Sequence, residues 1–462
     1  MTAGTPIALL ALFALIPLTA YVFWSKRPAI AVPVVGFFAA LFGPEGSYFK
    51  LPLVPPLDKL TLPYLLLFVF ALVRCGPQLK RAKIFRGADL LILLAILGGF
   101  LTLATNGDAL RYGSWRTIDI PPLVINDGIQ LGFQELLLAG FPFILGRALF
   151  RSPRDLRDLL HFLVVAGLIQ TLFIWVELRM SPQFHTWLYG YGAHSDFLQT
   201  IRWGGYRPMV FMAHGLAMAL FMLVAFLAVI VLREAGETQI RDRFRIGRVA
   251  IYLGVVLVLC KSTGAILYAL VLVPLLLRGR PERQVKVAAF LAALVLLYPV
   301  LRASDLVPVD ALVDQAKSLS PERAQSLEFR FDNEEMLLEK ARERFAFGWG
   351  GHGRRSVYDD ELGKEIAVAD GHWIIVLGAR GALGFLEAFG LLVIPIFLVR
   401  RRFARLRDPA ERKGLAGFAL IVAICAFDLL PNGLFSNYIY LLAGALMGMA
   451  QEIQKRTNTW ST

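Results

Sequence analysis

The sequence predicts an all-α polytopic membrane protein with about 12 transmembrane helices, within a range of about 11 to 13. Composition is the first observation behind this prediction, because 57% of the 462 residues are hydrophobic and only 18% are charged. Soluble proteins average roughly 45–50% apolar and 25% charged residues. The second observation is that apolar runs approaching the ~20 residues of a spanning helix recur along the whole chain. Together these observations exclude a water-soluble globular protein.

Thirteen apolar runs, each bounded by charged residues or by proline and glycine, are candidate spans. They fall at about 7–24, 29–43, 62–74, 89–105, 132–147, 158–178, 208–232, 249–260, 264–277, 286–301, 373–399, 414–428 and 434–450. We expect about ten spans within residues 1–301, three within 373–450, and a cytoplasmic tail at 451–462. The first run lacks a preceding basic segment and a following A-x-A site, so it is interpreted as a span and not as a cleaved signal.

The formal net charge of +13 is distributed unevenly between the connectors. Basic residues concentrate at 74–86, 147–157, 233–248, 278–286 and 400–413, which fall on one side when the spans alternate. Cytoplasmic loops carry such an excess of lysine and arginine, so this side is expected to face the cytoplasm. Because the basic residues are scattered and no aromatic-rich domain accompanies them, nucleic-acid binding is not expected. The side of residue 1 stays open, since it depends on whether both of the first two runs cross.

The opposite connectors are longer and less basic, at 44–61, 106–131, 179–206 and 302–372. The last contains 15 acidic and 10 basic residues and is expected to form a large periplasmic loop. Connections of this length are usually functional. Within it, residues 328–345 have the spacing of an amphipathic helix, which either lies on the membrane face or covers a cavity.

Common soluble-enzyme motifs are absent from the sequence, namely GxxxxGK[ST], HExxH, GxSxG and a strand-anchored GxGxxG. The cysteines, Cys75, Cys260 and Cys425, lie far apart and without CxxC spacing or a nearby histidine. Neither a disulfide framework nor a zinc site is therefore expected, and no cofactor or metal is predicted. The functional signal lies instead in polar residues near the outer membrane face.

Two arginines lie at the mouth of the candidate span 208–232. Arg202 and Arg207 flank the sequence WGGY, and His214 is expected about two turns inside the span. An ionisable residue within a span is costly and marks a candidate functional site. Arginine at a span entrance can alternatively snorkel to lipid phosphate, so both interpretations stay open for this pair.

The tetrapeptide Lys-Ser-Thr-Gly at 261–264 interrupts a long apolar stretch from 249 to 277. We expect a tight outer turn between two short helices here, because the stretch is long for a single span. Non-helical backbone at membrane depth is tolerated only against protein or a wet cavity. Lys261 therefore either lies beside Arg207 or contacts lipid headgroups.

A glycine-rich segment at 348–355 contains His352 and Arg354. Glycine lets backbone N–H groups approach an oxyanion closely, and arginine binds oxyanions with two parallel hydrogen bonds. This combination favours a phosphate-binding loop. Gly381 and Gly384 in the following span are interpreted as sites of close helix packing.

The order of these features resembles the O-antigen ligase and polymerase superfamily over residues 200–450. The shared pattern runs from Arg207 opening a span, through the Lys-Ser-Thr-Gly turn and Arg330 in the long loop, to FGWG at 347–350, a polar pair and GxxG. Members of that family are metal-independent membrane glycosyltransferases of the type C architecture, and the resemblance implies this fold here. It also implies transfer of a glycan from an undecaprenyl diphosphate carrier to a sugar hydroxyl at the periplasmic face. The acceptor is lipid A core in ligases and another repeat unit in polymerases.

The resemblance also implies roles for individual residues. The donor diphosphate would be bound by Arg207, Lys261, Arg330 and Arg202. The ligase pattern places histidine and a small polar residue nine residues before GxxG, whereas here Asp370-Gly371 occupy that pair and His372 follows. Asp370 or His372 is therefore the candidate catalytic base, which weakens the ligase assignment relative to a polymerase. Further candidates for the acceptor or loop site are His352, Arg354 and His214.

The chemistry implied by these residues is a single inverting displacement. Cations neutralise the departing diphosphate, and one base removes the proton of the attacking hydroxyl. A transporter or flippase of a lipid-linked or anionic substrate stays open as the alternative, because arginines facing a cavity also suit substrate passage. The expected partners are the lipid-linked donor, a glycan or lipid A core acceptor and membrane lipids, in a bacterial inner membrane. A purely structural role would leave the long loop unexplained.

Overall fold

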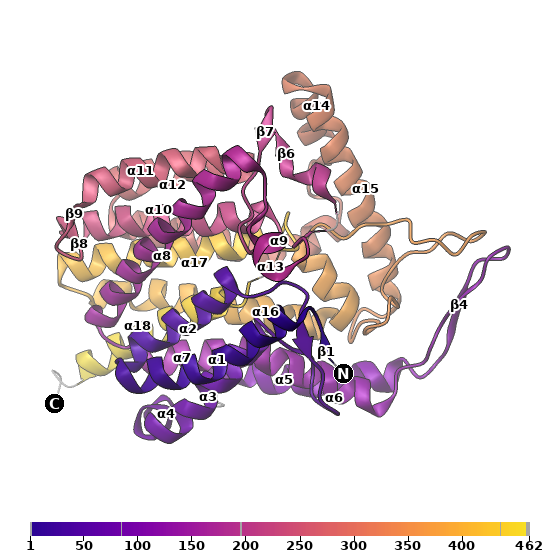
Figure 1. Ribbon diagram of the computed structural model, residues 1–462, viewed down its shortest axis with the longest axis horizontal. Helices are drawn as coiled ribbons and strands as arrows, with labels where there is room; N and C mark the ends of the chain where they lie inside the picture. Colours follow the sequence, from indigo (N-terminus) through magenta and orange to yellow (C-terminus); the bar gives the residue numbers. More distant parts are fainter. Residues whose placement is uncertain (1, 85, 195, 435, 459–462) are drawn as a thin grey trace.

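The computed structural model describes residues 2–84, 86–194, 196–434 and 436–458, and it is a bundle of helices (Figure 1). Each of the thirteen candidate segments overlaps a helix. The N-terminal half contains α1 (Pro6–Ser25), α2 (Pro28–Phe42), α3 (Thr61–Arg74), α4 (Gly76–Ala82), α5 (Leu90–Thr105), α6 (Ile125–Glu135), α7 (Phe141–Leu149), α8 (Pro153–Met180) and α9 (Phe184–Tyr189). The C-terminal half contains α10 (Gly215–Glu234), α11 (Ile246–Leu259), α12 (Thr263–Arg278), α13 (Pro281–Ala303), α14 (Val309–Leu319), α15 (Pro321–Glu343), α16 (His372–Arg402), α17 (Pro409–Asp428) and α18 (Tyr438–Asn458).

Seven of the described helical segments are long and apolar enough to cross a membrane. The bent pair α3 and α4, which meet at 100°, would make an eighth. Further apolar helices, including α2, α11, α12 and the described part of α18, are shorter. The chain is therefore a multi-pass helical membrane protein, because several segments meet the length and hydropathy that a bilayer requires.

The connectors separate onto two opposite ends of the bundle (Figure 1). We call the end that carries residues 44–60, 106–124, 181–194, 196–214, 260–262 and 304–371 the loop face, and the opposite end the basic face. The basic face carries the connectors that are rich in lysine and arginine. This arrangement agrees with the alternation of the candidate spans.

Short antiparallel strands lie at both ends of the bundle. β1 (Thr2–Ala3), β2 (Tyr48–Phe49) and β3 (Leu57–Asp58) form a three-stranded sheet, with Thr2 opposite Phe49. Because β2 and β3 belong to the loop face, the described N-terminal residues lie there as well. The other pairs are β4 (Leu110–Tyr112) with β5 (Ile118–Ile120), β6 (Ile201–Arg202) with β7 (Gly205–Tyr206), and β8 (Gln239–Ile240) with β9 (Phe244–Arg245).

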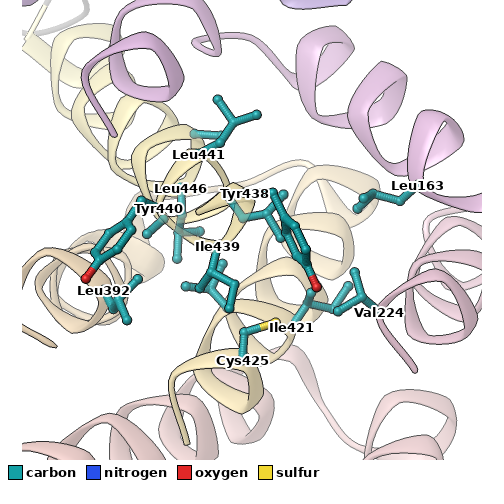
Figure 2. Packing of buried hydrophobic residues seen from close by; sticks show 14 of the residues in the cluster. Leu163, Val224, Leu392, Ile421, Cys425, Tyr438, Ile439, Tyr440, Leu441 and Leu446 are labelled. Carbon is teal, nitrogen blue, oxygen red and sulfur yellow. The ribbon is translucent and has the colours of Figure 1, made fainter. Parts of the chain in front are cut away.

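The core of the bundle lies around α18, and Figure 2 shows its side chains among residues of α8, α10, α16 and α17. Tyr438 and Tyr440 are 1% and 2% exposed, and Figure 2 shows them turned toward different neighbours. α18 also packs closely on α7, where a side-chain carbon added at Gly444 would overlap the carbonyl of Phe143. Small residues allow such close approach of helices within a membrane. This close packing holds α7 and α18 together in the core of the bundle.

α16 is folded sharply at Gly381 and is not one straight helix. The ring centroids of His372 and Phe389 lie 6.1 Å apart. In a straight helix their backbones would be ~25 Å apart, at ~1.5 Å per residue. Gly381 has φ 65° and ψ −166°, a conformation essentially restricted to glycine. It divides α16 into a first arm, residues 372–380, and a second arm, residues 382–402.

The loop around FGWG satisfies the backbone that this fold leaves without helical partners. The amides of residues 349–350 donate to the carbonyls of residues 378–379, at 2.8 Å each. The amides of residues 382–383 donate to the carbonyls of residues 345–346, at 2.7 and 3.3 Å. Broken helices are tolerated at membrane depth only with such replacement partners. The glycines of this region therefore shape the fold, and the predicted binding of a phosphate by residues 348–355 stays a prediction.

The long loop contributes a helix, α15, that packs on the bundle. Its range covers most of the expected helix at 328–345. Glu334 is buried, where it accepts hydrogen bonds from Trp373 at 3.3 Å and from Tyr298 at 3.2 Å. Asn333 Oδ1 accepts from the amide of Val368 at 2.6 Å. These contacts fix α15 against α13 and α16 and so position the residues one turn earlier.

Candidate functional site

Five charged side chains from four parts of the chain gather on the loop face. We call this group the cationic cluster: Arg202, Arg207, Lys261, Arg330 and Asp370. Four positive charges and one carboxylate leave the group with three uncompensated positive charges. The structure thus brings together the four residues that the resemblance assigned to the diphosphate and one of the two assigned to the base.

Arg207 is the most enclosed member of the cluster, at 5% exposed. Its Nη2 donates to the carbonyl of Lys261 at 3.2 Å, and its backbone amide donates to Thr200 at 2.7 Å. Its Nε has no hydrogen-bond partner among the described residues. Burial, together with Arg202 and Arg330, lowers the pKa of Arg207 to about 10, which still leaves it charged at neutral pH.

The span that follows Arg207 begins later than the sequence predicted. α10 starts at Gly215, and residues 208–214 are not helical, so His214 caps the helix and does not lie two turns inside it. A side-chain carbon added at Gly215 would overlap Cγ and Cδ of Arg207. The glycine therefore leaves the space through which the Arg207 side chain passes.

Lys261 lies in the turn between α11 and α12, as the sequence predicted. Its backbone has φ 53°, and Ser262 caps α12 by accepting from the amide of Ala265 at 3.5 Å. Partial burial lowers the pKa of Lys261. A side-chain carbon added at Gly205 would lie 2.5 Å from Nζ of Lys261, so the β6–β7 hairpin and this turn are in close contact.

Arg330 and Asp370 form the only ion pair within the cationic cluster as described. Arg330 Nε lies 3.3 Å from Asp370 Oδ2, and both side chains are about one-third exposed, at 38% and 35%. Arg330 projects from α15, one turn before the anchoring Asn333 and Glu334. Burial raises the pKa of Glu334, consistent with its role as an internal anchor.

His214 is held as a neutral imidazole beside the cluster. Its Nδ1 accepts from the amide of Leu216 at 3.0 Å, so Nε2 carries the hydrogen that faces Gln199 Oε1 at 3.1 Å. Burial and the charge of Arg207 lower the pKa of His214 to about 4. With both ring nitrogens engaged, His214 is suited to positioning the start of α10 and is poorly placed to take a proton from an acceptor.

His372 lies apart from Asp370 although only one residue separates them. Its backbone amide donates to Leu429 at 2.9 Å, and its ring packs near Phe389 in the second arm of α16. The ring therefore points into the bundle, whereas the Asp370 carboxylate joins the cationic cluster. Of the two predicted catalytic residues, the structure brings only Asp370 to the cations.

His352 and Arg354 make their contacts with a different part of the loop face. His352 Nε2 lies 3.1 Å from Asp127 Oδ1. Arg354 is fully buried and donates to the carbonyls of Asp108 and Pro121 at 2.8 and 2.9 Å. A guanidinium so fully engaged holds the loop to the α5–α6 connector, which is a structural role and differs from the predicted contact with a ligand.

Two open pockets of the molecule lie on the basic face, not beside the cationic cluster. One, of about 450 Å³, is lined by residues of the α10–α11 connector and the start of α11. The other, of about 350 Å³, is lined by residues of α2, α8 and the same connector, including Arg157 and His161. Neither is lined by a member of the cluster.

Sequence reasoning missed a second group of charges, Glu135, Arg380 and Glu387, which meet inside the bundle. Their positions within apolar runs were the available signal, because an ionisable residue in a span is by default a functional candidate. Among the described residues, no group of three histidine, cysteine, aspartate or glutamate side chains is arranged to hold a metal ion.

Comparison with known proteins assigns this chain to no family. No family model matches the sequence. No curated protein matches it either. The fold and the site define a multi-pass helical membrane protein with a cluster of cations on one face, backed by a helix that is broken at glycine.

Proposed function

We propose that this protein is a membrane glycosyltransferase of the O-antigen ligase or polysaccharide polymerase type. In this proposal about 12 spans cross the bacterial inner membrane and the loop face is periplasmic, in keeping with the positive-inside rule. The enzyme transfers a glycan from undecaprenyl diphosphate to a sugar hydroxyl. The acceptor is lipid A core in a ligase or a repeat unit in a polymerase.

The observation that carries the proposal is the cationic cluster. Arg207 and Arg330 come from segments more than a hundred residues apart, and Lys261 comes from a third segment. The three uncompensated charges match a diphosphate, which gains negative charge when the bond to the sugar breaks. Fixed cations aimed at developing charge are usually the largest single contribution to such catalysis. An outer-face position suits a diphosphate attached to a membrane-embedded lipid.

Asp370 is the proposed general base. As the acceptor hydroxyl oxygen bonds to the anomeric carbon, the bond from that carbon to the diphosphate oxygen breaks. The hydroxyl proton passes to the Asp370 carboxylate, and the diphosphate leaves with its charge neutralised by Arg207, Lys261 and Arg330. One displacement with one base inverts the anomeric configuration. Arg330 pairs with Asp370, and a bound diphosphate would compete for this arginine and free the carboxylate.

The test is transfer by the purified full-length protein in proteoliposomes, with a polyprenyl diphosphate glycan as donor, candidate acceptors and EDTA. We expect transfer to persist in EDTA and to fall by about 10²- to 10³-fold in Arg207→Ala, as on loss of one oxyanion donor. Asp370→Ala is expected to lose about 10²- to 10⁴-fold. Arg111→Ala is the control, because Arg111 is 70% exposed on the β4–β5 hairpin. Unchanged transfer in both site variants, or no transfer to any acceptor, would contradict the proposal.

A transporter or flippase of a lipid-linked or anionic substrate is the second candidate. It is favoured by the broken α16 and by the buried group of Glu135, Arg380 and Glu387, since transporters use discontinuous helices and intramembrane ionisable residues. The two functions separate in one vesicle experiment. Movement of labelled lipid-linked glycan between leaflets, without formation of a new glycosidic bond, would support transport and exclude the transferase.

A further inference from the structure

Three charged side chains meet beside the fold in α16, away from the cationic cluster. Arg380, the last residue of the first arm, pairs with Glu135 of α6 and, at 3.0 Å, with Glu387 of the second arm. The side chains of Arg380, Glu135 and Glu387 are 15%, 12% and 1% exposed. We call these three residues the buried triad. The proposed transfer reaction uses none of them.

The charges of the buried triad do not balance if both carboxyl groups are ionised. One guanidinium faces two carboxylates, which leaves one negative charge within the spanning part of the bundle. The other titratable groups near Arg380 are Tyr440 of α18 and His372 of the first arm. A protonated His372 would place a second positive charge beside the guanidinium of Arg380. The helix α5 packs on both α6 and α16 and supplies no titratable group, because residues 90–105 contain none. An uncompensated buried charge costs several kcal/mol.

A second observation concerns the Glu387 carboxyl group itself. Its Oε2 pairs with Arg380, but its Oε1 is buried and has no hydrogen-bond partner among the described residues. Leaving an ionised oxygen without a partner in such a place carries the full cost of removing it from water. A proton on the carboxyl pair removes that cost, because the triad then contains one positive and one negative charge.

We propose that Glu135 and Glu387 share one exchangeable proton, which makes the buried triad a neutral proton-binding site inside the bundle. The proton arrives from water onto a carboxylate oxygen and returns to water, and only an O–H bond is made or broken. The site joins two irregular helices. Glu135 directly precedes a π-helical turn at Leu136–Gly140, and Arg380 directly precedes the break at Gly381. The inference holds for either candidate function.

The test is infrared spectroscopy of the full-length protein in detergent at neutral pH. We expect a carbonyl-stretch band from a protonated carboxyl group that shifts in D₂O and disappears in Glu387→Gln or Glu135→Gln. Glu452→Gln is the matched control, because Glu452 lies outside the buried triad and pairs with two arginines, Arg81 and Arg151. A spectrum without this band, or a band that survives in both triad variants, would overturn the inference.

A second readout is the dependence of thermal stability on pH. If the folded triad keeps a proton that the unfolded chain releases, stability falls as pH rises above the range in which free carboxyl groups titrate. Glu387→Gln mimics the protonated carboxyl group and should remove this fall of stability with pH, whereas Glu452→Gln should keep it. An identical slope in wild type and in both glutamine variants of the triad would count against the shared proton.

Discussion

The variant Gly215→Ala is expected to weaken donor binding while the protein still folds. An alanine side chain there would overlap Cγ and Cδ of Arg207 and lie 3.1 Å from the carbonyl of Pro208. The contact is with the middle of the arginine, so the guanidinium must leave its position beside the carbonyl of Lys261. Helix propensity alone would favour alanine over glycine by roughly 0.5–1 kcal/mol. We therefore expect Gly215→Ala to fold with a Tm within about 4 °C of wild type.

The expected loss is in donor binding. Displacing one charge-assisted hydrogen bond costs about 1.5–3 kcal/mol, which corresponds to a rise of about 10- to 150-fold in KM for the polyprenyl diphosphate donor. The assay is transfer in proteoliposomes at varied donor concentration. Gly264→Ala is the matched control, because Gly264 lies in the first turn of α12 on the same face and has open space around it. Equal KM values in wild type and both variants would refute the role given to Arg207.

Two further predictions concern stability. The pKa of His214 falls from its ordinary 6.5 to about 4, so the folded protein disfavours the protonated imidazole. The free energy of unfolding is therefore highest above pH 6.5 with respect to this group, and it falls by at most about 3 kcal/mol as pH falls toward 4. Thermal unfolding should show a shallower acid limb in His214→Asn, which keeps a helix cap, and an unchanged limb would contradict the neutral imidazole. Gly381→Ala should lower stability by at least about 1–3 kcal/mol, because φ is 65° and the added carbon would lie 2.5 Å from backbone atoms of Ala346 and Phe347. Gly247→Ala, which has open space, should leave Tm unchanged.

Much of the fold could be predicted from the sequence because apolar runs and the sign of connectors are local properties. The helices, the two faces and the turn at Lys261 follow from them. The start of α10 was predicted too early, since residues 208–214 are apolar but not helical. Apolarity alone cannot reveal this difference.

The fold in α16 was not predictable by the same reasoning. Its two arms form one continuous apolar run, and only the backbone at Gly381 shows that the chain turns there. The partners that stabilise this turn come from residues 345–350, and one of the two carboxylates that meet Arg380, Glu135, comes from α6. Such contacts between distant segments are set by tertiary packing. For the same reason the separation of Asp370 from the ring of His372 could not be read from their adjacency.

The cationic cluster is the part of the site where sequence and structure meet most closely. The resemblance assigned Arg202, Arg207, Lys261 and Arg330 to the donor diphosphate from their positions in the sequence. The structure places them together with Asp370. Their action on a diphosphate remains a prediction.

The most direct test of this prediction is the structure of the full-length protein with bound farnesyl diphosphate, determined by electron cryomicroscopy in a lipid nanodisc. The account predicts density for the diphosphate within hydrogen-bond distance of Arg207, Lys261 and Arg330, with the Arg330–Asp370 pair opened. Diphosphate density at another part of the molecule, with this ion pair intact, would contradict the account.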